Sequence, residues 1–354
     1  MRLDEPSWWY EAEGKPFIAR ALSPISALYA RAVEHRLNRS KSYRSSLPVI
    51  CVGNLTVGGT GKTPFAMHIA EELKALGEQP AFLTRGYRGS VKTAHWVDTE
   101  SDTAHDVGDE PLLLARVAPT LVSKDRPDGA RAIEESGRAS VIVMDDGLQN
   151  PSLAKDFTFA IVDGRRGIGN GMVLPAGPLR ARLAFQLARV DAIILNNPPS
   201  SAVRENGLSF LRSHFSGPIC KSHPEPSGDV EWLRGARVVA FAGIANPQRF
   251  FHLLEALGAQ IAAVVQRPDH HFFSQDDARE ILDFAAKHKA MLVTTEKDWV
   301  RLKGGSGALA ELKQQSRTLP IRTVLDKTER ELLIPLLQSA LRKARQALAS
   351  SRGR

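Results

Sequence analysis

The chain has 354 residues, 43% of them hydrophobic, and a formal net charge of +8 at pH 7. This size is enough for a large core and two domains. Only Cys51 and Cys220 are present, which argues against a disulfide scaffold and favours a reducing cytosol. No apolar run is long enough to cross a bilayer, and no secretory signal is visible. The charge predicts a partner with phosphates: a nucleotide, a nucleic acid or an anionic membrane.

The first predicted element is an amphipathic helix between Pro16 and Asn38. Its apolar residues recur at intervals of three and four, which places them on one face. They are Phe17, Ile18, Ala21, Leu22, Ile25, Leu28, Tyr29, Ala32 and Val33. Basic residues surround this face, and the aromatic cluster Trp8-Trp9-Tyr10, typical of a membrane–water interface, precedes it. Two interpretations stay open: a helix packed on the core with a solvated basic rim, or one lying in an anionic membrane surface.

A glycine-rich turn between an apolar strand and a helix predicts a phosphate-binding loop. The strand is Pro48–Val52 and the helix extends to about Leu76. Backbone N–H groups and the positive end of the helix would point at one spot, with Lys62 on the outer phosphates and Thr63 on Mg²⁺. Thr56 stands where the usual pattern has a glycine. The predicted ATP-binding residues are Thr56, Val57, Gly58, Gly59, Thr60, Gly61, Lys62 and Thr63.

Short apolar runs alternate with helical stretches from Pro48 to about Asn196. Continuously apolar strands are typical of a parallel sheet covered on both faces, so we expect a doubly wound, mostly parallel α/β fold like that of P-loop NTPases. The break at Pro198–Ser201 and the proline- and serine-rich stretch from Pro218 to Gly228 precede a second, smaller α/β domain. The expected boundaries are 1–46 for the N-terminal helix, 47–220 for the domain with the phosphate-binding loop, 221–327 for the smaller domain, and 328–354 for a C-terminal helix with a basic tail.

The second half of a nucleotide site is predicted at Asp145-Asp146-Gly147, after the apolar strand Val141–Met144. A carboxylate at a strand end is what a P-loop enzyme uses to hold Mg²⁺. Taken alone, Asp-Asp-Gly is more often a turn than a metal site. Its occurrence together with the predicted phosphate loop favours the metal site.

Other strand ends and loops carry candidates with two interpretations each. Asp109 is either a helix N-cap or a base at the sheet edge where ligands bind. Arg85 either clamps phosphate or belongs to a solvated turn. The adjacent histidines His270 and His271 lack metal-pair spacing, which favours a hydrogen-bonding role for one of them. Thr295–Asp298 is equally compatible with a salt-bridged scaffold and with a site.

Seven motifs in order resemble the tetraacyldisaccharide 4′-kinases, the lipid A 4′-kinases of Gram-negative bacteria. They extend over nearly the whole chain. They are Val57–Pro64, Thr84–Tyr87, Gly108–Pro111, Asp145–Gln149, Leu174–Arg180, Asp269–Phe272 and Thr294–Asp298.

The resemblance implies a peripheral enzyme on the cytoplasmic face of the inner membrane. It would use ATP and Mg²⁺ to phosphorylate the 4′-hydroxyl of an acylated disaccharide 1-phosphate, giving lipid IVA. Asp109 would orient or deprotonate that hydroxyl, and His270, from the second domain, would position the Asp109 carboxylate. Closure of the two domains on ATP would assemble the site. Arg85 and Arg180 are the candidate substrate ligands. Two residues depart from the family pattern: Asn150 stands where a histidine is expected, and Ala181 stands where an acidic residue commonly follows Arg180.

The main alternative is a membrane-associated ATPase switch, which also joins such a loop to an amphipathic helix. These switches carry a lysine immediately before the two glycines, where this chain has Val57. A soluble metabolite kinase leaves the basic aromatic N-terminus unexplained. We expect no nucleic-acid partner, because no recognition module is apparent.

Overall fold

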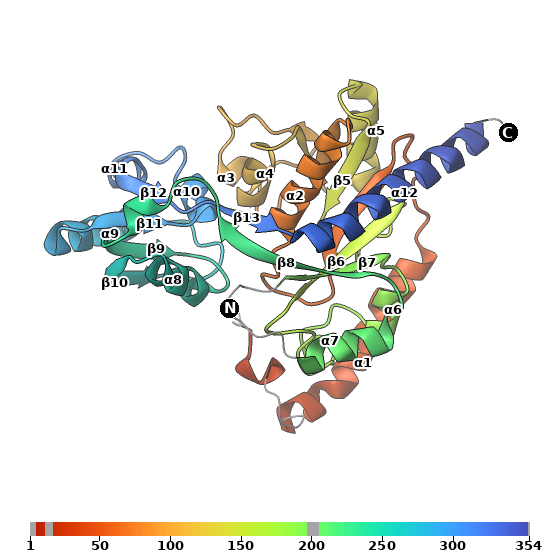
Figure 1. The fold of residues 1–354 in the computed structure, drawn as a ribbon, viewed down its shortest axis with the longest axis horizontal. Coiled ribbons are helices and arrows are strands. Elements are labelled where there is room, and N and C mark those ends of the chain that lie inside the picture. The colour runs from red at the N-terminus through yellow and green to blue at the C-terminus, as the bar shows by residue number, and fades with distance from the viewer. Residues whose placement is uncertain (1–4, 11–16, 197–204, 353–354) are drawn as a thin grey trace. The chain divides into compact units, whose positions relative to one another are not determined.

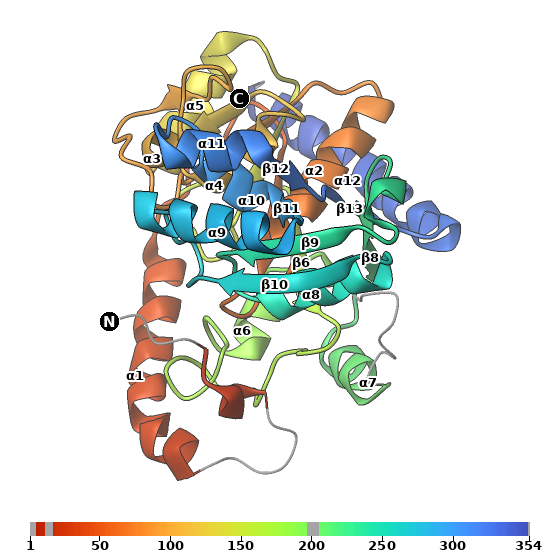
Figure 2. The same ribbon diagram turned by 90° about the vertical axis from the view of Figure 1, so that its left-hand side faces the viewer.

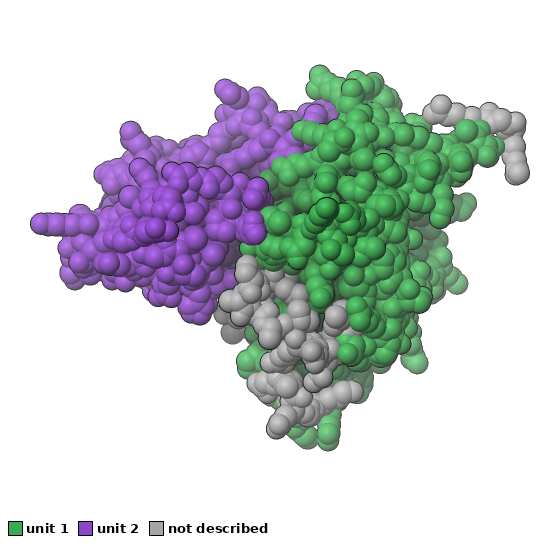
Figure 3. Space-filling model, in the orientation of Figure 1, with its two compact units in different colours: residues 1–85, 123–224, 323–354 green, residues 86–122, 225–322 purple. Residues whose placement is uncertain are grey.

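The computed structural model describes residues 5–10, 17–196 and 205–352, which form two compact units (Figure 3). Unit 1 comprises residues 1–85, 123–224 and 323–354, and unit 2 comprises 86–122 and 225–322. This division differs from the expected boundaries. Residues 86–122 belong to unit 2 rather than to a kinase domain spanning 47–220, and the C-terminal helix belongs to unit 1. The predicted break at Pro198–Ser201 lies outside the described residues.

Unit 1 is built on a mostly parallel sheet, which confirms the expected doubly wound fold. Its strands follow the order β13-β8-β7-β6-β1-β5-β2. The neighbouring pairs from β8 to β2 are parallel. The strand bounds are β1 Val49–Asn54, β2 Pro80–Thr84, β5 Val141–Asp145, β6 Phe157–Asp163, β7 Ala192–Asn196, β8 Ile219–Pro226 and β13 Ile321–Val324. The proline- and serine-rich stretch from Pro218 to Gly228 thus contains β8, and β13 lies beside β8 rather than in the sheet of the smaller domain.

Helices cover both faces of this sheet (Figure 1). Alternate residues of β6 point to opposite faces: Phe159 packs edge-on against Phe65 of α2, whereas Ala160 and Val162 pack in a cluster with Ala30 of α1. Glu72 of α2 accepts two hydrogen bonds from Arg330 of α12, at 2.7 and 2.8 Å. The helices of unit 1 are η1 Ser7–Trp9, α1 Phe17–Arg39, α2 Lys62–Ala75, α5 Arg126–Ser136, α6 Leu183–Leu187, α7 Glu205–His214 and α12 Lys327–Arg352.

Helix α1 packs against the rest of unit 1 through small and polar side chains rather than through its large apolar ones. Ala19, Ser26, Ala30 and Glu34 are buried. Glu34 pairs with Arg182, and the Ser26 hydroxyl accepts a hydrogen bond from the backbone N–H of Ala176. The large apolar residues exposed on α1 are Phe17, Ile18, Ile25, Leu28 and Tyr29. No helix among the described residues combines the length and the apolar character needed to cross a membrane.

Trp9, expected with Trp8 and Tyr10 at a membrane interface, is instead buried in unit 1, with 7% of its surface exposed. Its indole Nε1 donates to the carbonyl of Pro175 at 3.3 Å. The aromatic cluster is therefore at least partly a packing element.

Unit 2 contains a parallel sheet of order β10-β9-β11-β12. On β9, Val238 and Ala240 pack with Phe250 of α8, whereas Val239 and Phe241 pack with Ile281 of α9. Figure 2 shows α8 and α9 with these strands. Helix α4 packs within the same unit, where Leu112 and Leu113 form a buried cluster with Val300 of α10.

The strands of unit 2 are β3 His95–Trp96, β4 Thr120–Val122, β9 Arg237–Ala242, β10 Gln260–Gln266, β11 Met291–Thr294 and β12 Ser316–Thr318. Its helices are α3 Ala104–Val107, α4 Asp109–Leu114, η2 Glu231–Leu233, α8 Pro247–Ala256, α9 Gln275–His288, α10 Glu296–Arg301 and α11 Ala308–Gln315.

Candidate active site

The predicted phosphate loop connects β1 to α2 in unit 1, at the carboxyl ends of the strands. Gly58 and Gly61 have φ angles of 94° and 91°, which side chains with a Cβ rarely adopt. Gly61 is the N-cap of α2, a helix of 14 residues, and Lys62 and Thr63 occupy its first turn. The loop thus presents the N-terminal end of a long helix, where an anion is stabilised.

Two buried asparagines hold this loop, and the sequence analysis did not identify them. Asn196 ends β7, and its Nδ2 donates to the carbonyl of Thr60 at 3.0 Å. Asn54 ends β1, and its Nδ2 lies 3.4 Å from the carbonyl of Gly58. A Cβ on Gly61 would lie only 2.3 Å from Asn196 Nδ2, so this contact requires glycine. The signal in the sequence was an amide at the end of each apolar strand.

Asp145 is the last residue of β5, the strand next to β1, and Asp146 follows it, so both lie at the strand end that the sequence predicted. The carboxylate of Asp146 lies 3.8 Å from Lys62 Nζ and 3.1 Å from Arg180 Nη1. Burial opposes ionisation of Asp146, but the charges of Lys62 and Arg180 outweigh it and lower its pKa. Asp145 is buried at the end of the strand. The structure therefore brings the predicted phosphate-loop lysine close to Asp146, one of the two predicted metal aspartates.

Three arginines lie around these groups. Arg180 also donates to the carbonyl of Thr56 at 3.2 Å and to Gln149 Oε1 at 3.2 Å. Arg85 is exposed directly after β2. Arg126, which the sequence analysis missed, is buried at the start of α5 and donates to the carbonyl of Ser123. Burial lowers the pKa of Arg126 to about 10, against the opposing charges of Asp145 and Asp146.

The same residues offer oxygen donors suited to Mg²⁺. The hydroxyl of Thr63 and the carboxylates of Asp145 and Asp146 are hard ligands, and Mg²⁺ beside a nucleotide typically uses one or two carboxylates together with phosphate oxygens. The two carboxylates lie at the carboxyl end of β5, the strand that pairs with β1 ahead of the loop. The chemistry of the donor set fits a magnesium nucleotide.

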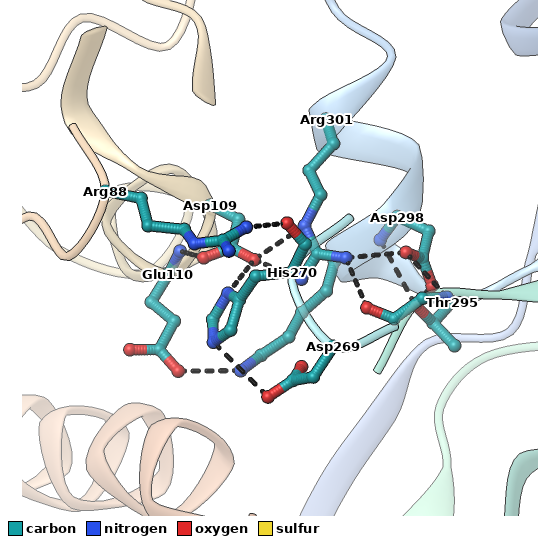
Figure 4. A network of polar contacts seen from close by, with 10 residues as sticks. Arg88, Asp109, Glu110, Asp269, His270, Thr295, Asp298 and Arg301 are labelled. Carbon is teal, nitrogen blue, oxygen red and sulfur yellow. Dashed lines mark hydrogen bonds and ion pairs between the residues drawn. The ribbon is translucent and has the colours of Figure 1, made fainter. Parts of the chain in front are cut away.

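A second group of predicted residues lies wholly within unit 2, around Asp109 (Figure 4). Asp109 is the first residue of α4 and its side chain is 5% exposed. Its Oδ2 accepts from His270 Nδ1 at 3.1 Å, from Arg301 Nε at 2.8 Å and from Arg301 Nη2. Its Oδ1 accepts from the backbone N–H of Glu110 at 2.9 Å. The expectation that Asp109 and His270 come from different domains is therefore wrong, because residues 86–122 are part of unit 2.

Arg301 links Asp109 to Asp298, and the sequence analysis did not identify it. Its Nη1 donates to Asp298 Oδ1 and to the carbonyl of Gly243, both at 2.7 Å. Asp298 also accepts from Thr295, the N-cap of α10. Lys297, two residues after Thr295, pairs with Glu110 at 2.7 Å. In this structure Thr295–Asp298 thus forms an ion-paired scaffold beside Asp109. The sequence signal that could have identified Arg301 is its position three residues after Asp298, the spacing of an ion pair within one helix.

His270 is held by its backbone as well as by its ring. It has a φ of 57°, its N–H donates to the carbonyl of Gly243 at 2.9 Å, and its carbonyl accepts from Arg88. The ring packs edge-on against Tyr87, with centroids 5.3 Å apart. The ring nitrogen that faces Asp109 is Nδ1, and Nε2 lies 3.6 Å from Asp269.

The charges around Asp109 keep it ionised. Burial raises the pKa of this carboxyl, but the hydrogen bond from His270 and the charge of Arg301 lower it by more, well below the ordinary range. Burial raises the pKa of Asp298, against the charge of Arg301. A fixed carboxylate that orients an imidazole is suited to positioning a hydroxyl and handling its proton.

Comparison with known proteins agrees with this chemistry. The family model described as tetraacyldisaccharide-1-P 4′-kinase matches residues 18–339. The tetraacyldisaccharide 4′-kinase of Parvibaculum lavamentivorans is 42% identical, over 91% of this chain and 94% of its own length. That of Rhodospirillum centenum is 41% identical, over 95% and 97%.

A crystal structure of LpxK from Aquifex aeolicus in complex with ATP superposes with a TM-score of 0.73 at 26% identity, covering 92% of this chain and all of that one. These matches do not favour an ATPase switch. The chain therefore belongs to the tetraacyldisaccharide 4′-kinase family and is an ATP-dependent kinase of lipid A biosynthesis.

Proposed function

We propose that the loop from Thr56 to Thr63 binds the ATP phosphates and that Lys62 neutralises the transferring phosphoryl group. The observation that carries this assignment is the convergence of Lys62, Arg180 and Asp146 beside the N-terminus of α2. Thr63 with Asp145 or Asp146 would hold Mg²⁺, which neutralises phosphate charge when bound. Phosphoryl transfer needs mainly such positioning and charge, with little covalent work for the protein.

Within the same proposal, Asp109 and His270 handle the proton of the acceptor hydroxyl as a unit. The Nδ1 hydrogen bond fixes the ring orientation of His270, and Arg301 fixes Asp109. A group that is already oriented loses little freedom when the acceptor arrives, which lowers the barrier to transfer. Arg85 and Arg180 remain candidates for the substrate phosphate. For Arg180 this role requires that it give up part of its contact with Asp146.

The acceptor is a lipid, and α1 supports docking at the cytoplasmic face of an anionic inner membrane. Phe17 and Leu28 are 84% and 66% exposed, and Ile18 and Ile25 are about half exposed. The exposed basic residues of the same helix are Arg20, Arg31, Arg36 and Arg39. Apolar side chains ringed by cations suit the interface of an anionic bilayer, where each basic residue adds about 1 kcal/mol.

Transfer of radiolabelled phosphate from ATP to a tetraacylated disaccharide 1-phosphate tests the site assignment. Asp145→Ala and Asp146→Ala should both reduce transfer severely. The variant that has lost the aspartate bound directly to Mg²⁺ should need a higher Mg²⁺ concentration for half-maximal transfer. Asp128→Ala is a matched control, because this carboxylate lies on the surface of α5 and forms an ion pair with Arg131 of the same helix. Normal transfer by both variants would contradict the metal assignment.

Sedimentation with anionic vesicles tests the docking surface. Changing Ile18, Ile25 and Leu28 to serine should release the protein and raise the KM for substrate in vesicles, while ATP affinity is unchanged. Salt should weaken binding of the unmodified protein, because it screens the basic residues. Leu332→Ser on α12 is the control, since Leu332 is also about half exposed. Vesicle binding that neither salt nor these serines change would leave α1 as a packed scaffold helix.

A further inference from the structure

The loop that follows β6 carries an arginine to the neighbourhood of the phosphate loop. β6 and β1 are parallel neighbours, so the segments after them leave the sheet at the same edge. Asp163, the last residue of β6, accepts hydrogen bonds from the backbone N–H groups of Arg165 at 2.8 Å and Arg166 at 3.2 Å. This turn fixes the backbone from which the Arg166 guanidinium extends.

One carboxylate, that of Glu5, lies between Arg166 and the phosphate loop. Glu5 Oε2 lies 2.6 Å from Arg166 Nη1 and accepts from the Tyr10 hydroxyl at 3.1 Å. Glu5 Oε1 faces Gly58 so closely that a Cβ on that glycine would lie 1.9 Å from it. The Arg166 guanidinium also stacks 4.8 Å from the centre of the Tyr10 ring. An anion with two oxygens thus already lies between a guanidinium and the glycine-rich loop.

The arm that carries Glu5 is packed rather than loosely attached. The carbonyl of Trp9 accepts from the backbone N–H of Asn170 at 2.7 Å, and Trp9 Nε1 donates to Pro175. A Cβ on Gly169 would lie 2.6 Å from the Trp9 carbonyl, so the close approach needs glycine there. The positions of residues 5–10 relative to the loop after β6 are therefore set by specific contacts.

We propose that Arg166 is a phosphate-binding residue of the ATP site and that Glu5 holds its place, to be exchanged for a nucleotide phosphate. A carboxylate and a phosphate present similar paired oxygens to a guanidinium, and the phosphate carries more charge. The side chains of Glu5 and Arg166 are 24% and 32% exposed, and an ion pair that water reaches adds little stability, so a more highly charged phosphate can displace the Glu5 carboxylate while the backbone of the arm stays packed. The inference rests on the proposed assignment of Thr56–Thr63 to ATP.

The proposal predicts opposite effects for the two members of the pair on the Kd of ATP, measured by calorimetry with Mg²⁺. Glu5→Gln removes the competing charge and should tighten binding about two- to fivefold. Arg166→Ala removes a phosphate ligand and should weaken binding about tenfold, with partial recovery in Arg166→Lys. In the double variant Glu5→Gln/Arg166→Ala, most of the tighter binding gained from Glu5→Gln should be lost, because that gain depends on the Arg166 guanidinium.

Arg345→Gln is a matched control, since it breaks a surface ion pair of the same unit, Arg345–Glu78 at 2.6 Å, and should leave Kd unchanged. Unchanged or weaker ATP binding by Glu5→Gln, or unchanged binding by Arg166→Ala, would overturn the exchange. Lys62→Ala in the same titration separates the two assignments. If it leaves Kd unchanged, the phosphate-loop assignment itself fails, whereas a normal loss with no effect at Glu5 and Arg166 rejects only the exchange.

Discussion

The two clusters of predicted site residues differ in how firmly their charges are held. At the phosphate loop, Lys62 and Asp146 are 3.8 Å apart, and the Asp146 side chain is 37% exposed. Around Asp109, the guanidinium of Arg301 is 1% exposed and hydrogen-bonds to Asp109, Asp298 and the carbonyl of Gly243. The Lys62–Asp146 pair is thus long and partly exposed, whereas the pairs that Arg301 makes with Asp109 and Asp298 are short and buried.

This difference matches what each cluster must do in the proposed mechanism. A residue that receives a charged ligand has to leave its resident partner, so a weak pair serves better than a strong one. A carboxylate that orients a hydroxyl must stay in place, so its partners should be buried and numerous. The comparison predicts that loss of Arg301, which holds the Asp109 carboxylate, acts mainly on stability, whereas loss of Lys62 at the loop acts mainly on catalysis.

The largest effect is expected from Arg301→Ala. It leaves Asp109 and Asp298 buried without their cation, and breaking such a pair costs about 3–5 kcal/mol of unfolding free energy. Urea denaturation measures this loss. Arg116→Ala, which breaks the more exposed pair of unit 2 with Glu296 at 3.0 Å, should cost about 1 kcal/mol or less. Equal, small losses in both variants would erase the distinction between the clusters.

Lys62→Ala should show the converse behaviour. Loss of its charge from the transferring phosphoryl group should lower kcat about a hundredfold or more. Its unfolding free energy should change by less than about 1 kcal/mol, since the pair with Asp146 is 3.8 Å long and the Asp146 carboxylate is partly exposed. Lys74→Ala, in the last turn of the same helix, controls for loss of a lysine. Near-normal transfer by folded Lys62→Ala would show that the loop does not hold the transferring phosphate.

A double-mutant cycle tests whether Asp109 and His270 act together. Asp109→Asn should lower kcat by more than about a hundredfold, and adding His270→Ala should cost little more, because the two groups share one task. Single-turnover transfer is the appropriate measurement. Losses that multiply in the double variant would mean that the 3.1 Å contact has no catalytic meaning.

The smallest effect expected is a pH dependence of stability assigned to Asp109. Its pKa is lower in the folded protein, so its contribution is fully present above the pKa of an unfolded carboxyl, about 4. That contribution should be lost progressively as the pH falls through the folded value. Urea midpoints between neutral and acidic pH should therefore fall less steeply for Asp109→Asn than for the unmodified protein. Identical slopes would show that Asp109 gains nothing from its partners.

The phosphate loop and the α/β fold could be predicted because their signals are local. Gly58–Thr63 is contiguous, and the apolar runs of β1, β5 and β6 follow from parallel strands being covered on both faces. Asp145 and Asp146 could be placed near Lys62 for the same reason, since carboxyl ends of neighbouring parallel strands share an edge.

The surroundings of Asp109 could not be predicted, because its partners are far away in the sequence.

Periodicity also identified the apolar residues of α1 without revealing that Ala19, Ser26 and Ala30 would face the protein. Small residues allow close approach of a helix to its neighbours, and hydrophobicity alone gives them little weight. The insertion of residues 86–122 into unit 2 left no mark in composition.

The discontinuity of unit 2 has a consequence for synthesis. Asp109 and Arg301 are 192 residues apart, which at 5–20 residues per second corresponds to roughly 10–40 s of translation. During that interval the segment 86–122 leaves the ribosome without the chain that completes its core. The nascent protein must therefore shield Leu112 and Leu113 until Val300 arrives, and the proposed proton-handling pair is among the last features of the enzyme to form.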